Sequence, residues 1–426
     1  MDTATLKSII LEQNNLRNAS SSTLREKLSS IESYLNIPHA VIISGIRRCG
    51  KSTLLAQILK NYFSKEIFYL SFEDERFIDF TSQDFNHLYE IFVEIYGERK
   101  IFFLDELQNI PKWELFVRRM QDQDFKFFIT GSNASLLSRE LGTRLTGRWV
   151  MIALFPFSFR EYLDFKNIKF EPEDIFHTRK RGLLKRNFNH YLKEGGMPEY
   201  LKYQDTSLLK RTYEDILYRD IIVRHDIRDV KALRELCLFL ISNISSLISY
   251  NKIKGLLGLG SVNTVKNYIQ YLEDAYLFFT VNQFSFSVKQ QAIAPKKIYA
   301  IDNGIAEAVA FQFSKNQGHY LENLVFLELK RNGHEIFYYK TKSGQEVDFV
   351  IREKNQLSQL IQVVYAFNDK AAREREINAL AIAMIETNCH SGLILTDDHK
   401  ETLHISHQKI SVLPVYQWLL NLTLNL

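Results

Sequence analysis

The sequence has few of the residues that interrupt or cross-link a folded chain. Only 17 glycines and 7 prolines occur in 426 residues, of which 46% are hydrophobic, so long disordered linkers are not expected. The three cysteines, Cys49, Cys237 and Cys389, are odd in number and far apart, which excludes a disulfide framework and favours a reducing cytoplasm. Because the chain is too long for one ordinary hydrophobic core, two or three domains are expected.

A strong net charge and long hydrophobic runs are also missing. The formal charge is +4 at pH 7, too small for a general polyanion binder, so any nucleic-acid surface must be local. Residues 1–30 lack a basic start followed by an apolar core, so no secretory signal is expected. The apolar tail from Val412 to Leu426 is interrupted by Pro414 and is too short to span a bilayer. We therefore expect a soluble, cytoplasmic protein without a membrane partner.

A glycine-rich loop between two apolar segments is the first positive feature. The strand-like segment 41–43 leads into a loop that fits G-x-x-x-x-G-K-[ST], and an apolar helical stripe follows. Backbone N–H groups of such a loop point at phosphate oxygens, Lys51 can reach the outer phosphates, and Ser52 can ligate Mg²⁺. The residues predicted to bind ATP are Gly45, Ile46, Arg47, Arg48, Cys49, Gly50, Lys51, Ser52 and Thr53.

A second stretch carries the carboxylates that ATP hydrolysis needs. Four apolar residues, 101–104, end in Asp105 and Glu106, which is a Walker B pattern. Asp105 can hold Mg²⁺ through water, and Glu106 can orient and deprotonate the attacking water. An apolar run that ends in Asp-Glu is common by itself, and the upstream phosphate loop makes it specific.

Four further residues are candidates for catalysis. Ser132 or Asn133, at the end of another apolar segment, could sense the terminal phosphate, or could merely cap the helix that follows. Arg148, or Arg144, could supply an arginine finger, and a surface ion pair is the alternative for either one.

Strands that alternate with helices, with polar chemistry at the carboxyl ends of the strands, predict an α/β fold with a parallel sheet that binds its ligand at that edge. We assign the ATPase domain to residues 1–157, with a helical extension over 1–37 that packs on the sheet edge.

These motifs resemble one family. The phosphate loop, Asp-Glu-Leu-Gln from 105, Thr-Gly-Ser-Asn from 130, and Gly-Arg leading into Phe-Pro-Phe-Ser-Phe-Arg-Glu-Tyr look like the bacterial and archaeal AAA-family ATP-binding proteins with a carboxyl-terminal domain of unknown function. Gly-Gly-Met-Pro from 195 and Gly-Gln-Glu-Val-Asp-Phe from 344 also look like family landmarks, so the similarity covers nearly the whole chain. The resemblance implies an AAA-like core, a winged-helix lid and a restriction-endonuclease-like terminal domain.

The middle region, residues 158–301, is predicted to be helical, with a winged helix at about 249–300. A short helix, a Gly-Leu-Gly turn and a second helix with a buried stripe through Val265 and Ile269 form the expected core of this module. The residues predicted to face DNA are Asn263, Thr264, Lys266, Asn267, Gln270 and Lys289.

The charge of this window supports a local basic surface. Its six lysines against Glu273 and Asp274 give 6 − 2 = +4; they are Lys252, Lys254, Lys266, Lys289, Lys296 and Lys297. Double-stranded DNA is one partner that fits, and a lid or a contact with a protein partner is the other.

The last region, residues 302–426, is predicted to be a small α/β domain with carboxylates on one strand face. Glu346 and Asp348 are two apart on a strand and Glu322 comes from the preceding helix, so the three could hold a second Mg²⁺ for phosphodiester hydrolysis.

A nuclease of this fold also needs an acidic residue and a lysine, two apart on the next strand. This sequence has Gln362 and Val364 there, so we expect a binding or scaffold role unless Lys340 or Lys342 supplies the missing charge. The combined prediction is a Mg²⁺-dependent ATPase whose nucleotide state controls the winged-helix and nuclease-like domains on DNA. An ATP-switched regulatory protein with a protein partner and an ATP-regulated nuclease are the alternatives.

Overall fold

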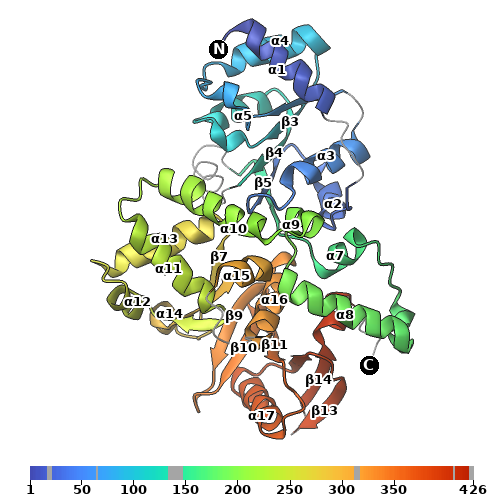
Figure 1. Ribbon diagram of the computed structural model, residues 1–426, viewed down its shortest axis with the longest axis vertical. Coiled ribbons are helices and arrows are strands. Elements are labelled where there is room, and N and C mark those ends of the chain that lie inside the picture. The colour runs from blue at the N-terminus through green and yellow to red at the C-terminus, as the bar shows by residue number, and fades with distance from the viewer. Residues whose placement is uncertain (17–21, 64–65, 133–146, 311–316, 406–407, 422–426) are drawn as a thin grey trace. The chain divides into compact units, whose positions relative to one another are not determined.

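The computed structural model describes residues 1–16, 22–63, 66–132, 147–310, 317–405 and 408–421 (Figure 1). The chain forms two compact units: unit 1 comprises residues 1–155 and 274–276, and unit 2 comprises 156–273 and 277–426. Within the described ranges, no helix combines the length and the apolar composition that a membrane crossing requires.

Unit 1 is built on a five-stranded parallel sheet in the order β2-β3-β4-β1-β5. Its strands are β1 (Ala40–Gly45), β2 (Phe68–Ser71), β3 (Ile101–Asp105), β4 (Lys126–Gly131) and β5 (Trp149–Leu154). The helices are α1 (Thr3–Leu16), α2 (Lys27–Ile31), α3 (Lys51–Tyr62), α4 (Phe85–Tyr96) and α5 (Trp113–Gln121). Since the strands are parallel, their carboxyl ends all meet at one edge, and the α/β sheet predicted from the sequence is confirmed.

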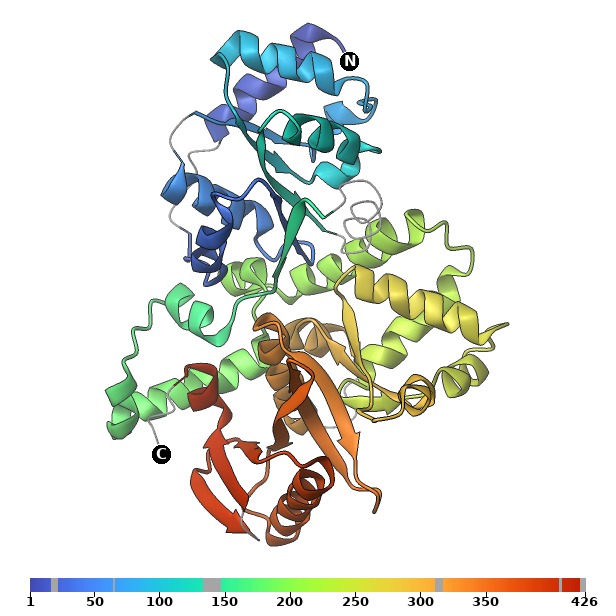
Figure 2. The same cartoon turned by 180° about the vertical axis from the view of Figure 1, so that it is seen from behind.

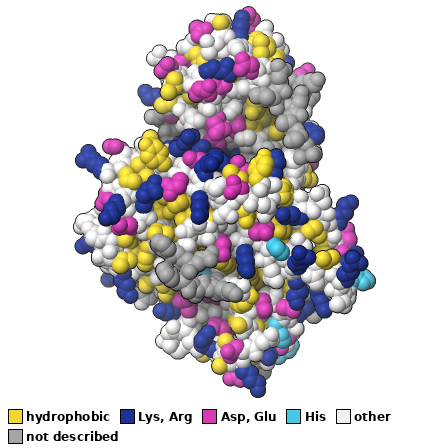
Figure 3. Space-filling model, viewed as in Figure 1, with side chains coloured by type: hydrophobic (Ala, Val, Ile, Leu, Met, Phe, Trp, Pro, Cys, Tyr) yellow, Lys and Arg dark blue, Asp and Glu magenta, His cyan; other side chains and the backbone are white. Residues whose placement is uncertain are grey.

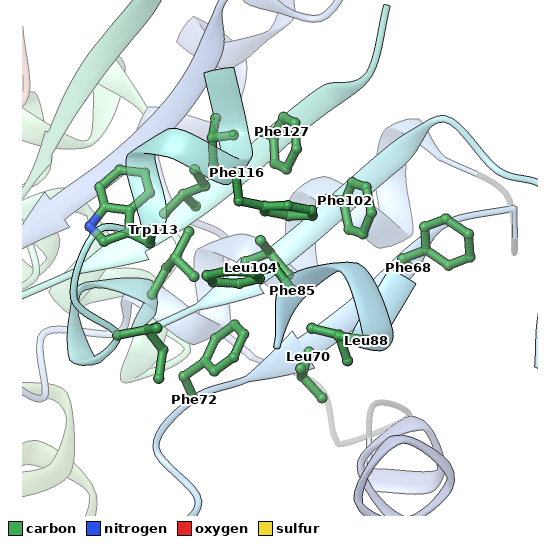
Figure 4. Close-up of a cluster of buried hydrophobic side chains, with 14 of the residues drawn as sticks. Phe68, Leu70, Phe72, Phe85, Leu88, Phe102, Leu104, Trp113, Phe116 and Phe127 are labelled. Carbon is green, nitrogen blue, oxygen red and sulfur yellow. The ribbon is translucent and has the colours of Figure 1, made fainter. Parts of the chain in front are cut away.

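Aromatic side chains fill one face of this sheet (Figure 4). The rings of Phe102 and Phe127, from adjacent strands, stack at a centroid distance of 5.0 Å, and Phe116 of α5 stacks on Phe85 of α4 at 4.5 Å. Helix α1 contacts the edge strand β2 and buries Leu6 in the same cluster, whereas α2 packs on α3.

The first part of unit 2 is largely helical. Its helices are α7 (Phe159–Phe165), α8 (Thr178–Glu194), α9 (Pro198–Tyr203), α10 (Thr206–Asp215), a π-helix (Ile216–Val223), α11 (Val230–Ser242), α12 (Tyr250–Leu256), α13 (Val262–Asp274), α14 (Val288–Ile293) and α15 (Asn303–Val309). A three-stranded antiparallel sheet in the order β6-β8-β7 lies among them, with β6 (Ser246–Ile248), β7 (Phe278–Val281) and β8 (Lys296–Ala300).

The rest of unit 2 is a six-stranded mixed sheet in the order β13-β14-β12-β11-β10-β9, with helix α17 packed on β11 and β12 (Figure 2). Its elements are α16 (Gln317–Arg331), β9 (Glu335–Lys340), β10 (Glu346–Glu353), β11 (Gln356–Val364), α17 (Lys370–Thr387), β12 (Ser391–Thr396), β13 (Glu401–Ile405), β14 (Gln408–Pro414) and α18 (Val415–Leu419).

A buried carboxylate explains the Gly-Gly-Met-Pro landmark of unit 2. Asp302 accepts hydrogen bonds from the backbone N–H groups of Gly196 (2.7 Å) and Ile305 (3.0 Å). A Cβ atom on Gly196 would lie 2.3 Å from the Phe157 carbonyl oxygen, so only glycine fits there. The residues on either side of position 302, where a domain boundary was expected, are therefore joined by buried contacts within one unit.

Candidate functional site

The loop between β1 and α3 has the backbone that a phosphate cradle requires. Gly50 has φ = 98°, a left-handed conformation that favours glycine, and α3 begins at Lys51 directly after it. Gly45 lies so close to β5 that a Cβ atom there would be 2.1 Å from the Leu154 carbonyl oxygen. Both glycines of the motif are therefore required by the local structure, one for its dihedral angle and the other for the space.

Lys51 is paired with the predicted catalytic base. Its ammonium is almost fully buried and lies 3.3 Å from Glu106 Oε1, and it also donates to the Ile46 carbonyl at 3.3 Å. Burial alone lowers the pKa of Lys51, but the Glu106 carboxylate raises it above its ordinary value. Burial likewise favours a high pKa for Glu106, and Lys51 lowers that pKa below its ordinary value. Both groups are therefore charged at neutral pH.

Asp105 and Ser52, the two predicted Mg²⁺ ligands, lie together. Asp105 Oδ1 accepts from Ser52 Oγ at 3.1 Å and also from the Thr130 hydroxyl. Thr130 in turn accepts from the backbone N–H of Glu106 at 2.8 Å. Burial raises the pKa of Asp105, an effect that the Thr130 hydrogen bond opposes. We had not predicted Thr130; strand β4 pairs Ile129 with Leu104, which places Thr130 beside Asp105.

Gln108 connects Glu106 to Ser132. Its Nε2 donates to Glu106 Oε2 at 2.5 Å and to the Ser132 hydroxyl at 3.3 Å. Glu106 itself adopts φ = 51°, a left-handed conformation that is uncommon for a non-glycine residue and is typical of functional sites. Ser132, predicted to sense the terminal phosphate or to cap a helix, thus lies near Glu106. Gln108 is a further site residue that the Asp-Glu-Leu-Gln motif contained.

Arg148, a predicted arginine-finger candidate, lies away from the cradle of its own chain. Strand β5 pairs Trp149 with Ala40 and Leu154 with Gly45, so Arg148 lies just before the amino end of the strand, six residues or roughly 20 Å along β5 from the level of Gly45. Its guanidinium forms an ion pair with Asp122, which was the alternative. Asn133 and Arg144, the other two candidates, lie outside the described residues.

The helical extension contributes a residue that the sequence did not reveal. Arg25 is buried, and its guanidinium donates to the Cys49 carbonyl of the cradle at 2.7 Å and to the Phe155 carbonyl at 2.6 Å. These two hydrogen bonds hold the backbone of the phosphate loop in place. A lone arginine in a polar segment carries no sequence signal for such a role.

The donor set fits ATP with Mg²⁺. Hydroxyl and carboxylate oxygens that converge within 3.1 Å, as those of Ser52 and Asp105 do, are the hard ligands that Mg²⁺ prefers. Lys51 and the N-terminus of the twelve-residue helix α3 supply positive charge and N–H donors for phosphates.

The predicted second metal site has a different organisation. Glu322, Glu346 and Asp348 do come together, but around the ammonium of Lys297, which lies 2.8 Å from an oxygen of each. Across the parts of the chain that the structure describes, no group of three or more His, Cys, Asp or Glu side chains is suited to hold a metal ion. Gln362 accepts from the Asp348 backbone N–H at 3.2 Å.

The predicted DNA-facing side chains lie on the outer side of α13 and on α14. Val265 and Ile269 are buried, as predicted. Asn263, Lys266, Asn267, Gln270 and Lys289 are exposed, and Thr264 is half-buried. The predicted local charge needs a correction, because Lys297 is buried among carboxylates; five lysines against two acids leave 5 − 2 = +3.

Comparisons with known proteins agree with the geometry of unit 1. Residues 38–163 match the family description "AAA domain", and residues 185–316 and 317–418 match two domains of unknown function. An uncharacterized protein of Methanocaldococcus jannaschii is 37% identical over 402 residues, which cover 90% of this chain and 88% of the relative. An uncharacterized protein of Haemophilus influenzae is 30% identical over 394 residues, which cover 89% of this chain and 94% of the relative.

Two solved structures are distantly similar. A signal transduction ATPase with numerous domains and a tetratricopeptide repeat sensor, from Pyrococcus horikoshii, has a TM-score of 0.28 and 15% identity, and the match covers 73% of this chain and 46% of that one. AMPPCP-bound DnaA from Aquifex aeolicus has a TM-score of 0.24 and 16% identity, with 58% of this chain and 86% of that one covered.

Proposed function

Because the chain belongs to the same family as these uncharacterized archaeal and bacterial proteins and carries an AAA domain, we propose that it is a Mg²⁺-dependent ATPase that acts on DNA through a winged helix. The observation that carries the ATPase part is the chain of contacts from Lys51 to Glu106 and through Gln108 to Ser132. This chain connects a phosphate-binding cation, a base and a buried hydroxyl at one edge of the sheet.

Each residue of the site has a role in the proposed hydrolysis. The loop N–H groups and Lys51 bind the phosphates, while Ser52 and Asp105 would hold Mg²⁺. When bound, Mg²⁺ neutralises phosphate charge as it develops during the reaction. Glu106 orients the attacking water and accepts its proton, and Gln108 holds the Glu106 carboxylate in place.

The proposed winged helix rests on the order of elements in unit 2. The elements follow in the order α11, β6, α12, α13, β7, α14 and β8, and β8 lies between β6 and β7 in the sheet. In such modules the helix in the position of α13 enters the major groove of DNA. Its outer side carries amides and a lysine, which suit base edges and phosphates.

Salt dependence tests the DNA part of the proposal. On the face seen in Figure 3, Lys and Arg side chains are interspersed with Asp and Glu, so binding is expected to be weak and local. Affinity should fall linearly on a log-log plot against salt, with a slope near −0.9 for each phosphate contacted. Removing Lys266 and Lys289 together should flatten the slope by up to about two units if each contacts one phosphate.

A matched pair of variants separates a local contact from a general charge effect. Lys193 and Lys210 are exposed on α8 and α10 of the same unit. Their joint replacement by alanine removes the same charge and should leave the salt-dependence slope unchanged. Each variant must melt at the wild-type temperature, because Lys266 is adjacent to the buried Val265.

The ATPase rate with and without DNA distinguishes this function from its main rival. Stimulation by double-stranded DNA is expected if the nucleotide state acts on DNA. No stimulation, together with no measurable DNA binding at low salt, would favour the rival, an ATP-switched regulatory protein that binds a protein partner.

A further inference from the structure

One strand of the three-stranded sheet reaches into the carboxylates of the terminal region. Lys297 and Tyr299 are two apart on β8 and therefore project to the same side of the strand. The Tyr299 hydroxyl donates to Glu322 Oε1 at 2.7 Å, and the same oxygen accepts from Lys297 at 2.8 Å. Both residues are buried: the relative exposure is 2% for Lys297 and 0% for Tyr299.

The ammonium of Lys297 is surrounded by carboxylates, and it donates hydrogen bonds to Glu322 and Asp348. A lysine ammonium has three N–H donors, and the three carboxylates of Glu322, Glu346 and Asp348 each place an oxygen 2.8 Å from its nitrogen. The second oxygen of Asp348 accepts from the Val363 backbone N–H at 2.9 Å, and this bond holds the Asp348 carboxylate, which comes from β10, against strand β11.

The spacing of the oxygens fits an ammonium better than a metal. Mg²⁺ requires oxygens at 2.0–2.1 Å, so each carboxylate would have to move inward by roughly 0.7 Å to bind Mg²⁺ at the position of the nitrogen. Yet the chemistry is that of a cation site, since the carboxylates come from two different elements, α16 and β10, and converge on one point.

The charge of Lys297 is secure. Burial alone lowers the pKa of Lys297, but the carboxylates of Asp348 and Glu322 raise it well above its ordinary value. Burial and the neighbouring Asp348 carboxylate raise the pKa of Glu322 to about 8, so Glu322 takes up a proton more readily than an ordinary glutamate.

We propose that Glu322, Glu346 and Asp348 form a masked divalent-cation site, in which the Lys297 ammonium occupies the place of the metal. The lysine joins β8 to α16 and β10 and excludes Mg²⁺, so the terminal region of the wild-type protein binds no metal at this point and does not cut DNA. Removing the lysine side chain exposes three carboxylates that are already convergent, and these then bind a divalent ion.

The test is Mn²⁺ binding to the nucleotide-free full chain, followed by electron paramagnetic resonance. Lys297→Ala is expected to gain one Mn²⁺ site, at least about tenfold tighter than any the wild type shows, because three convergent carboxyl groups lose the cation at their centre. Mn²⁺ should also raise the melting temperature of this variant and not that of the wild type. The added change Asp348→Asn should abolish both effects.

Lys296→Ala is the matched control. Lys296 precedes Lys297 on the same strand, and its ammonium lies 5.7 Å from the centre of the Tyr250 ring instead of among the carboxylates. This variant loses the same charge one residue away and should gain no Mn²⁺ site.

Three results would overturn the proposal. The first is wild-type protein that already binds Mn²⁺ with an affinity that Asp348→Asn removes. The second is a Lys297→Ala variant that gains no Mn²⁺ site. This holds whether the variant folds or fails to fold even in Mn²⁺, since in both cases the metal is unable to replace the ammonium. The third is Mg²⁺- or Mn²⁺-dependent cleavage of plasmid DNA by the wild type that is lost in Lys297→Ala, because the lysine would then be catalytic.

Discussion

Glu106→Gln should separate ATP binding from ATP hydrolysis. The change removes the base but nearly keeps the shape of the side chain, so turnover should fall by roughly 10² or more. The structure adds a second expectation. Lys51 lies 3.3 Å from Glu106, and bound phosphates must compete with this carboxylate for the lysine. The variant should therefore bind ATP more tightly than the wild type.

The size of the binding effect follows from the ion pair. At 3.3 Å and an effective dielectric constant of about 20, the attraction is about 332/(20 × 3.3), or about 5 kcal/mol. Most of it is recovered when Lys51 exchanges a carboxylate for phosphates. If about a fifth of it opposes ATP binding, the variant gains about 1 kcal/mol, or roughly a fivefold lower Kd.

Calorimetric titration of ATP and a phosphate-release assay measure the two quantities on the same protein. Glu94→Gln is the control, because Glu94 is largely exposed and pairs with Lys7 instead of a residue of the loop, so it removes an equal charge outside the site. Unchanged hydrolysis in Glu106→Gln would place the base elsewhere. An unchanged or higher Kd would show that the pair with Lys51 does not oppose binding.

Three further variants test the two units. Lys51→Ala should abolish ATP binding or hydrolysis, and normal turnover would contradict the assigned cradle. Gly45→Ala should weaken ATP binding and lower the melting temperature, because the new Cβ atom would lie 2.1 Å from the Leu154 carbonyl oxygen, whereas Gly182→Ala, with no atom within 4 Å, should do neither. Asp302→Asn tests a buried acid, since burial raises the pKa of Asp302 from 3.8 to about 6. The folded state then keeps a proton that the unfolded state has lost, so wild-type stability relative to the variant should fall by up to about 3 kcal/mol in urea unfolding as the pH rises from about 4 to about 7. A constant difference would refute this.

The sequence indicated which side chains of the candidate nucleotide site lie together, because a contiguous motif and a parallel sheet place them. A phosphate loop is one run of residues, and parallel strands bring Asp105 and Ser132 to the same edge as that loop. The same rule could have placed Arg148 at the opposite edge of the sheet, because it precedes its strand. A parallel sheet thus allows prediction of which end carries chemistry.

The lysine at the centre of the three predicted carboxylates could not be predicted in the same way. Lys297 is 25 residues from Glu322 and 51 from Asp348, and a Lys-Lys pair beside a winged-helix pattern indicates a surface. Only the packing of β8 against α16 and β10 shows that one lysine of the pair is buried. Local patterns report periodicity and motifs, but not which charged residue is sequestered by a distant element.

Arg25 also determines how the chain can be divided. A fragment that begins at Ala40, the first residue of β1, retains every motif residue but loses the guanidinium that Cys49 and Phe155 use as a donor. Each buried carbonyl left unpaired costs about 1–3 kcal/mol. The fragment also loses α1, which exposes the aromatic cluster at β2. The smallest fragment of the ATPase unit that can be studied in isolation must therefore include the residues before β1. A boundary drawn at the first sequence motif is not a boundary of the folded unit.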